Sequence, residues 1–120
     1  MQDGLLFVNL RDFDAIHGPN RDLGGFAAAL AEFDAWLGGF LQQIHPEDLV
    51  IFTASHGHDP TFRGQDRTRE ELPIIVMGGE KNGPLPTRDT FADIAATLSA
   101  YFELQEPWQR GKSLFEFKPQ

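Results

Sequence analysis

Residues 49–61 read LVIFTASHGHDPT, and this stretch decides how the rest of the chain is interpreted. Its apolar start, residues 49–54, is typical of a strand buried on both faces of a parallel sheet. Ligands of α/β sheets gather at the carboxyl ends of the strands. The loop that follows is therefore a candidate metal or phosphate site, with the side chains of Ser55, His56, His58 and Asp59.

Two further elements precede this stretch. Residues 4–10, GLLFVNL, form another uninterrupted apolar run and predict a first buried strand. Apolar residues then recur at steps of three and four from Leu23 to Ile44, which predicts a long amphipathic helix. Asp22 is placed as its N-cap, and the helix should end before Pro46 because proline disfavours helical geometry at the preceding residue.

Three elements follow the loop. Residues 72–79, LPIIVMGG, predict a third strand that ends at a glycine pair. A second helix, capped by Thr87 or Asp89, is expected to face inward through Phe91, Ile94, Ala95, Leu98 and Phe102. Residues 108–117 are expected to add an edge strand or a packing arm. This order predicts an α/β layer fold, with helices packed on a mostly parallel sheet, in one domain over residues 1–120.

Composition excludes several classes of protein. The 120 residues carry a net charge of −8 without a Lys/Arg cluster, which argues against nucleic-acid binding. The first apolar run is too short for a signal sequence or a membrane span, so a cytoplasmic protein is expected. The chain has 0 cysteines. Any metal must therefore be held by histidine and carboxylate, which suits Mn, Mg or Zn.

The predicted strand ends bring several possible ligands to one edge. Asp12, Asp14 and His17 follow the first strand, and His56, His58 and Asp66 follow the second. A local alternative exists for each, because His–carboxylate pairs are common in solvated loops and Asp59-Pro60 is a common turn dipeptide. Likewise, Arg67 and Arg69 suit bidentate phosphate binding or, alternatively, a solvated loop paired with Glu70 and Glu71.

Three segments, taken together, resemble a known family. They are GLLFVNLRDFDAIHGPNRDLGGFAAALAEFDAWL, DLVIFTASHGHDPTFRGQDRTREELPIIVMG, and TFADIAATLSAYF with GKSLF. In order and spacing they resemble the C-terminal part of the core domain of the phosphopentomutase family, in the alkaline-phosphatase-like metalloenzyme superfamily. The resemblance implies a partial alkaline-phosphatase-like fold and a two-manganese site that moves a phosphoryl group between ribose positions through a phosphothreonine.

The resemblance also predicts metal ligands, and this chain departs from them. Asp14 and His56 match two family ligands. Pro19, Ser55 and Arg67 stand at positions where the family has metal-binding histidine, aspartate and histidine. The family's N-terminal strand, its nucleophilic threonine and its cap domain have no counterpart in the resembling segments.

Three functional hypotheses follow. The first is a degenerate, non-catalytic module with a binding or regulatory role, in which Arg67 replaces a metal's charge and helps to bind a phosphorylated small molecule. A homodimer or a partner protein would cover its exposed sheet edge. The second is a metal-dependent phosphoryl-transfer enzyme, completed by a partner chain or using one Mn or Zn ion in a rearranged site. That site would consist of Asp14, His17, His56 and His58. A structural domain with idle histidines is a third possibility.

Overall fold

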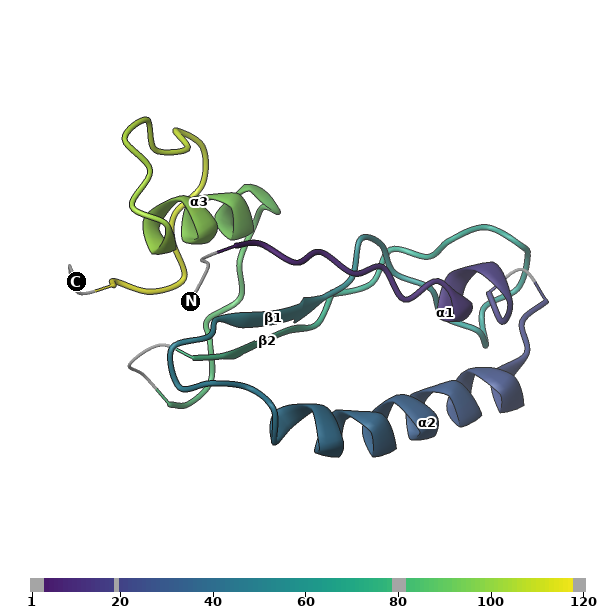
Figure 1. The fold of residues 1–120 in the computed structure, drawn as a ribbon. Coiled ribbons are helices and arrows are strands. Elements are labelled where there is room, and N and C mark those ends of the chain that lie inside the picture. The colour runs from purple at the N-terminus through teal and green to yellow at the C-terminus, as the bar shows by residue number, and fades with distance from the viewer. Residues whose placement is uncertain (1–3, 19, 79–81, 118–120) are drawn as a thin grey trace. The chain divides into compact units, whose positions relative to one another are not determined.

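The computed structural model describes residues 4–18, 20–78 and 82–117 (Figure 1). Its elements are α1 (Asp12–Ala15), α2 (Leu23–Leu41), β1 (Val50–Thr53), β2 (Ile74–Met77) and α3 (Ala92–Tyr101). The fold thus has helices and strands, as an α/β protein should. The chain divides into two compact units, Met1–Val76 and Met77–Gln120. The expectation of a single domain stays a prediction.

Helix α2 forms where the apolar periodicity predicts it. The Asp22 side chain accepts a hydrogen bond from the Gly25 amide at 2.9 Å, which confirms the predicted N-cap. The helix ends at Leu41, with Gln42 as its C-cap, shortly before the His45-Pro46 pair. No described helix is long and apolar enough to span a bilayer.

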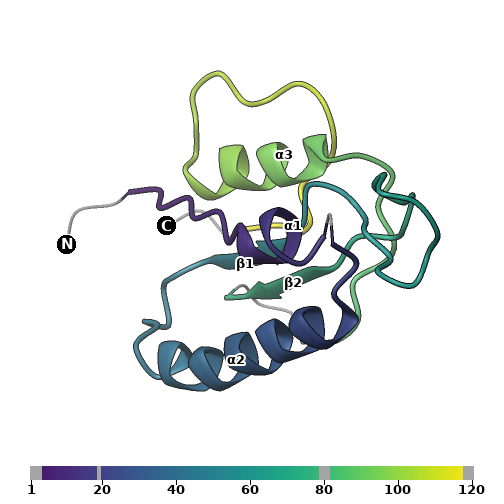
Figure 2. The same ribbon diagram turned by 90° about the vertical axis from the view of Figure 1, so that its right-hand side faces the viewer.

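Aromatic side chains pack α2 against the strands of the first unit. Phe33 and Phe40 of the helix meet Phe52 of β1 edge to face, at centroid distances of 6.0 and 6.4 Å. Phe13 of α1 packs on Phe26 at 5.4 Å. Figures 1 and 2 both show α2 running alongside the β1–β2 ribbon. These edge-to-face pairs join α1 to α2 and α2 to β1 in the first unit.

The sheet differs from the predicted one. Strands β1 and β2 pair antiparallel: Thr53 Oγ1, at the end of β1, donates to the carbonyl of Pro73, just before β2. An antiparallel bridge between Gly57 and Thr68 continues the same hairpin. A mostly parallel sheet is therefore not confirmed. Parallel neighbours need a crossover connection, whereas these two strands are joined through a loop that folds back on itself.

The apolar segment, residues 4–10, forms no strand in the described structure. Its five large apolar side chains are exposed: Leu5 by 66%, Leu6 by 85%, Phe7 by 86%, Val8 by 63% and Leu10 by 52%. The prediction of a strand here is wrong for this structure. A strand needs a paired neighbour, and none of the described segments pairs with this one.

In the second unit, α3 buries polar side chains more deeply than its predicted apolar face, of which Ile94, Ala95, Leu98 and Phe102 are half-buried. The buried residues are Asp93, Ala96, Thr97 and Ser99, while Phe91 is 58% exposed. The reason is the chain that follows, because its amides need acceptors: Trp108 donates to Ser99, Lys112 to Asp93 and Leu114 to Thr97, each at 2.9 Å.

Residues 108–117 are therefore a packing arm, as one of the two sequence alternatives predicted, and contain no strand. The arm approaches α3 closely at Gly111, where a Cβ would lie 2.5 Å from the carbonyl carbon of Ala92. Neither Thr87 nor Asp89 caps α3. The hydroxyl of Thr90 instead accepts from the Ala92 amide at 3.1 Å.

Candidate functional site

The loop between β1 and β2 is a folded hairpin end with its own hydrogen bonds. Beyond the Gly57–Thr68 bridge, the Thr68 hydroxyl accepts a hydrogen bond from the Asp59 amide at 2.7 Å. Only glycine fits at position 57, because a Cβ there would lie 2.7 Å from both Thr68 O and Glu70 N. This close approach holds His56 and Arg67 on the two facing sides of the loop.

Asp14 receives both of these side chains. Its Oδ2 accepts a hydrogen bond from Nη2 of Arg67 at 2.9 Å, and its Oδ1 lies 3.4 Å from Nε2 of His56. Helix α1 supplies the carboxylate, and the hairpin loop supplies the histidine and the guanidinium. Two sequence-predicted metal ligands thus come together, with a permanent cation beside them.

The other ring nitrogen of His56 restricts its protonation. Nδ1 lies 3.1 Å from the Gly57 carbonyl, which can only accept, so Nδ1 must carry a proton. A neutral ring would then turn the lone pair of Nε2 toward the carboxylate of Asp14. The backbone therefore orients the ring through Nδ1, and Nε2 faces Oδ1 of Asp14.

Charge around Asp14 favours its ionised form. The hydrogen bond from Arg67 is the main reason that the pKa of Asp14 lies below its ordinary value, with a smaller contribution from His56. Asp14 and Arg67 are 42% and 61% exposed at the side chain, so solvent screens their attraction. The pair is a solvent-accessible ion pair rather than a buried one.

His17 does not join Asp14. Its Nδ1 lies 3.3 Å from Oδ2 of Asp22, the N-cap of α2. This contact and the stronger bond from the Gly25 amide both lower the pKa of Asp22. His17 is therefore placed as a partner of the helix cap, the local role that a loop histidine often has.

His58 has a different environment. Both of its ring nitrogens are buried and have no hydrogen-bond partner in the described structure. Asp59, next to it, forms a local turn instead: its Oδ1 accepts from the amide and the hydroxyl of Thr61, at 2.8 and 2.7 Å. These bonds lower the pKa of Asp59 and favour the turn interpretation of Asp59-Pro60.

Arg21 was not identified from the sequence and proves to be the residue that holds the hairpin loop. Its Nη1 donates to the Asp59 carbonyl at 3.0 Å, and its Nε donates to the carbonyl of Gly64. The guanidinium lies 5.9 Å from the ring centroid of Phe62. Its φ of +47° is unusual for a residue other than glycine. The sequence carries no signal for such a contact across 43 residues.

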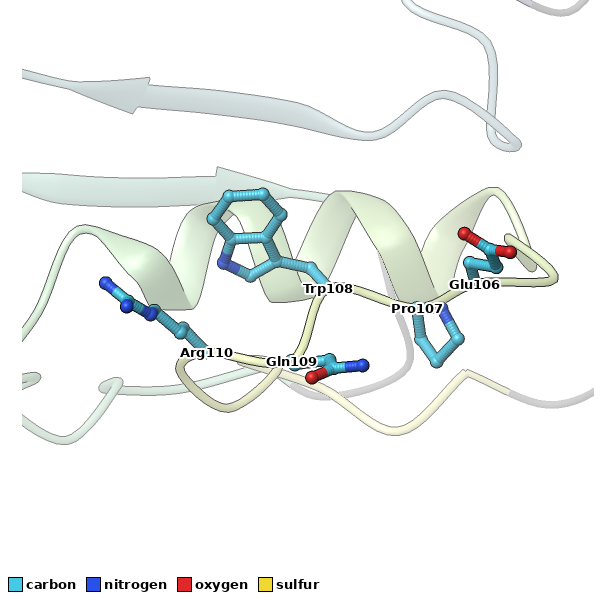
Figure 3. Close-up of a pocket in the computed structure, with 5 residues that line it drawn as sticks. All are labelled: Glu106, Pro107, Trp108, Gln109 and Arg110. Carbon is cyan, nitrogen blue, oxygen red and sulfur yellow. The ribbon is translucent and has the colours of Figure 1, made fainter.

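A shallow pocket of about 350 Å³ lies in the second unit (Figure 3). Five consecutive residues line it: Glu106, Pro107, Trp108, Gln109 and Arg110. It includes none of the residues that the sequence singles out. Because a single exposed stretch of chain forms it, it lacks the converging groups of a ligand site.

Known proteins are similar to this chain over most of its length. The family model described as the metalloenzyme superfamily matches residues 1–106. The chain belongs to this superfamily. The phosphopentomutase of Serratia proteamaculans is 47% identical over 112 residues, which are 92% of this chain and 27% of that protein. The phosphopentomutase of Methylobacterium nodulans is 51% identical over 102 residues, 84% of this chain and 25% of that protein.

The phosphopentomutase of Edwardsiella ictaluri matches over a similar range, with 46% identity over 114 residues, 94% of this chain and 28% of that protein. The sequence-based resemblance is confirmed. The chain spans about a quarter of the length of these curated relatives and corresponds to their C-terminal part.

Superfamily membership implies a metal ion, and the described residues do not fit one well. Among them, no group of three or more His, Cys, Asp or Glu side chains is placed to hold an ion. Asp14 and His56 provide two ligands, fewer than the three protein ligands typical of catalytic zinc sites. Arg67 donates to the same carboxylate and opposes a second cation. The Pro19 substitution falls outside the residues that the structure describes.

Proposed function

We propose that this member of the metalloenzyme superfamily is a phosphopentomutase-like module that does not catalyse alone and has a binding role. The observation that carries the proposal is the hydrogen bond of 2.9 Å from Arg67 to Asp14. A guanidinium cannot lose its proton in a protein, so its charge stays beside the carboxylate at every physiological pH.

Electrostatics indicate how strongly Arg67 would oppose an ion. At a separation of about 4 Å in water, a unit charge and a divalent cation repel by about 2 kcal/mol, and by more where solvent is excluded. This corresponds to an affinity at least about tenfold weaker. Breaking an exposed ion pair adds only about 0–1 kcal/mol. The proposal that the chain has no resident metal is therefore supported mainly by the repulsion between Arg67 and a cation and by the small number of ligands. The cost of breaking the ion pair between Arg67 and Asp14 contributes less.

The test of this proposal is an activity assay. The purified chain is incubated with Mn²⁺ and ribose 1-phosphate, and ribose 5-phosphate and free phosphate are measured. We expect neither product above the level of a heat-inactivated control. Turnover that is lost in a His56→Ala variant would contradict the proposal.

The proposed ligand of the module is a phosphorylated small molecule, bound with the help of Arg67 and Arg69. Both arginines are exposed and flank Thr68, which bridges to Gly57 across the hairpin. A thermal-shift titration with inorganic phosphate tests this. If phosphate raises the melting temperature of the native chain but not that of Arg67→Ala, the result supports phosphate binding by Arg67. An equal rise in that variant contradicts it.

One observation favours the second candidate, a metal-dependent phosphoryl-transfer enzyme. The unpartnered, buried nitrogens of His58 are a costly arrangement that a bound cation would relieve. A single Mn or Zn ion would then use Asp14, His17, His56 and His58, with His17 released from the helix cap. Equal metal affinity of the native chain and a His56→Ala, His58→Ala double variant would exclude this candidate.

A further inference from the structure

The loop after β2 contains the dipeptide Asn82-Gly83, in which an asparagine is followed directly by glycine. Both residues are exposed and lie outside every described helix and strand. The φ angle of Gly83 is +131°, and a Cβ built there would meet nothing within 4 Å. Among the described residues, none accepts a hydrogen bond from the Gly83 amide. The Asn82 side chain and this amide therefore lie in open surroundings that permit them to approach each other.

An asparagine in such surroundings reacts with the main-chain nitrogen that follows it, which makes asparagine a thermolabile residue. The nitrogen of Gly83 forms a bond to Cγ of Asn82, and the bond from Cγ to Nδ2 breaks. The side-chain nitrogen leaves as ammonia and takes the proton of the attacking amide. Water then opens the resulting succinimide ring at either of its carbonyl carbons. One product is aspartate, and the other is isoaspartate, in which the main chain continues through the side-chain carbonyl.

Glycine at position 83 favours this reaction for a steric reason. A side chain on the attacking residue would crowd the approach of its nitrogen to Cγ, and glycine has no side chain. Glycine also reaches main-chain angles that other residues rarely adopt, as the φ angle of Gly83 shows. The dipeptide Asn82-Gly83 thus combines a reactive sequence with a conformation that leaves the reacting atoms accessible to each other and to water.

The other two asparagines of the chain, Asn9 and Asn20, lack one or more of these features. Asn9 is also exposed, but the bulky Leu10 follows it. After Asn20, the amide of Arg21 donates to the Gly18 carbonyl at 3.1 Å, and the Asn20 side chain itself donates to a main-chain carbonyl at 3.3 Å. These hydrogen bonds keep the two reacting groups apart, so the chain contains its own controls.

We propose that Asn82 is a site of spontaneous deamidation, at which the chain acquires aspartate or isoaspartate. The new carboxyl group has an ordinary pKa of about 3.9, so at neutral pH it adds a negative charge to a chain that already carries −8. The open space around Gly83 accommodates the longer main chain of isoaspartate, so β2 and α3 should remain folded. This inference is independent of the proposed binding role and of the state of the metal site.

The test is prolonged incubation of the native chain at mildly alkaline pH, followed by proteolysis and mass spectrometry of the peptides. We expect the peptide with residue 82 to exchange ammonia for water, while the peptides with Asn9 and Asn20 stay unchanged. The modified chain should also accept a methyl group from S-adenosylmethionine when an isoaspartyl carboxyl methyltransferase is added. A fresh sample, digested in the same way, corrects for deamidation during proteolysis.

Matched variants identify the reacting atoms. Asn82→Gln keeps a side-chain amide but would have to close a larger ring, so the variant should stay unmodified at this position. Gly83→Ala adds a side chain to the attacking residue and should slow the reaction several-fold. Asn9→Gln is the control and should be modified at residue 82 as fast as the native chain.

Two results would overturn the inference. One is deamidation of Asn9 or Asn20 that is as fast as that of Asn82. The other is an intact Asn82 in the folded chain over a period in which a synthetic peptide of residues 77–88 loses most of its side-chain amide. Neither result bears on the binding of phosphate or Mn²⁺, which the titrations measure separately.

Discussion

The two units of the molecule are stabilised in opposite ways. In the second unit, Asp93, Thr97 and Ser99 are buried and bond to the amides of the packing arm that follows. In the first unit, the only described residue classed as buried is Gly18, while the apolar segment and parts of α2 are exposed. The second unit thus pairs these buried polar side chains through hydrogen bonds of its own. The first unit, which carries the candidate site, leaves large apolar side chains exposed.

The largest effect should come from the buried threonine of the second unit. Thr97 is 0% exposed, and its hydroxyl donates to the Asp93 carbonyl and accepts from the Leu114 amide. Thr97→Val leaves the half-buried amide of Leu114 without its partner, which should cost about 1–3 kcal/mol.

Each unit contains one tryptophan, so the loss can be assigned to a unit. In a Trp36→Phe background, Trp108 fluorescence reports on the second unit during denaturant unfolding. The exposed Thr87→Val is the control and should unfold as the parent does. Equal free energies of unfolding for the two variants would show that the buried hydroxyl of Thr97 does not stabilise the second unit.

Acid should open the second unit through Asp93. Its pKa lies below the ordinary 3.8, first because the Lys112 amide donates to it and then because Arg88 does, at 2.6 Å. A carboxylate with a lowered pKa in the folded state stabilises the fold above its unfolded pKa, and this contribution is lost as the pH falls through the lowered value. Trp108 emission should therefore change below about pH 4.

Asp93→Asn provides the comparison for this pH dependence. The amide cannot titrate, so the variant should be less stable at neutral pH and should have a flatter profile between about pH 2 and 5. An unchanged acid transition in Asp93→Asn would assign the transition to other carboxylates.

A smaller, local effect is expected in the first unit at Arg21. Arg21→Met keeps an apolar stem but removes the hydrogen bonds to the carbonyls of Asp59 and Gly64. The hairpin loop should open more readily, by about 1 kcal/mol, which hydrogen exchange over residues 59–64 measures. Arg63→Met changes an exposed arginine of the same loop and should exchange as the native chain does. Equal exchange in both variants would contradict the role of Arg21.

The smallest effect on stability is expected at Arg67. Its ion pair with Asp14 is exposed, so Arg67→Ala should change the free energy of unfolding by less than about 1 kcal/mol. Denaturant unfolding followed by Trp36 fluorescence measures this. A loss several times larger would mean that the pair stabilises the unit and does not mainly set the charge of the site.

Local sequence patterns predicted the elements that depend on local interactions. The apolar spacing and the Asp22 cap predicted α2, and the apolar run before the histidines predicted β1. The predicted parallel sheet was not confirmed, and the prediction of a strand over residues 4–10 was wrong. A buried-strand pattern states that a segment should be covered, and it does not state which polypeptide covers it.

The candidate site shows the same limit. Asp14 and His56 lie close together, as expected. The reason inferred from the sequence does not hold, because residues 4–10 form no strand whose end could meet that of β1. His17 was not, since Asp22 lies only five residues away and competes for its ring. The burial of Thr97 and Ser99 on α3 was missed because buried Thr and Ser are unusual, and only the returning arm makes their burial favourable.

The most direct test of the account is a calorimetric titration of Mn²⁺ into chelator-treated native chain and into Arg67→His. Arg69→His, which changes a neighbouring exposed arginine, is the control. We expect no stoichiometric binding by the native chain or by Arg69→His, and binding at least about tenfold tighter in Arg67→His, where a ligand replaces the cation. Stoichiometric binding of Mn²⁺ by the native chain that is lost in His56→Ala would contradict the account.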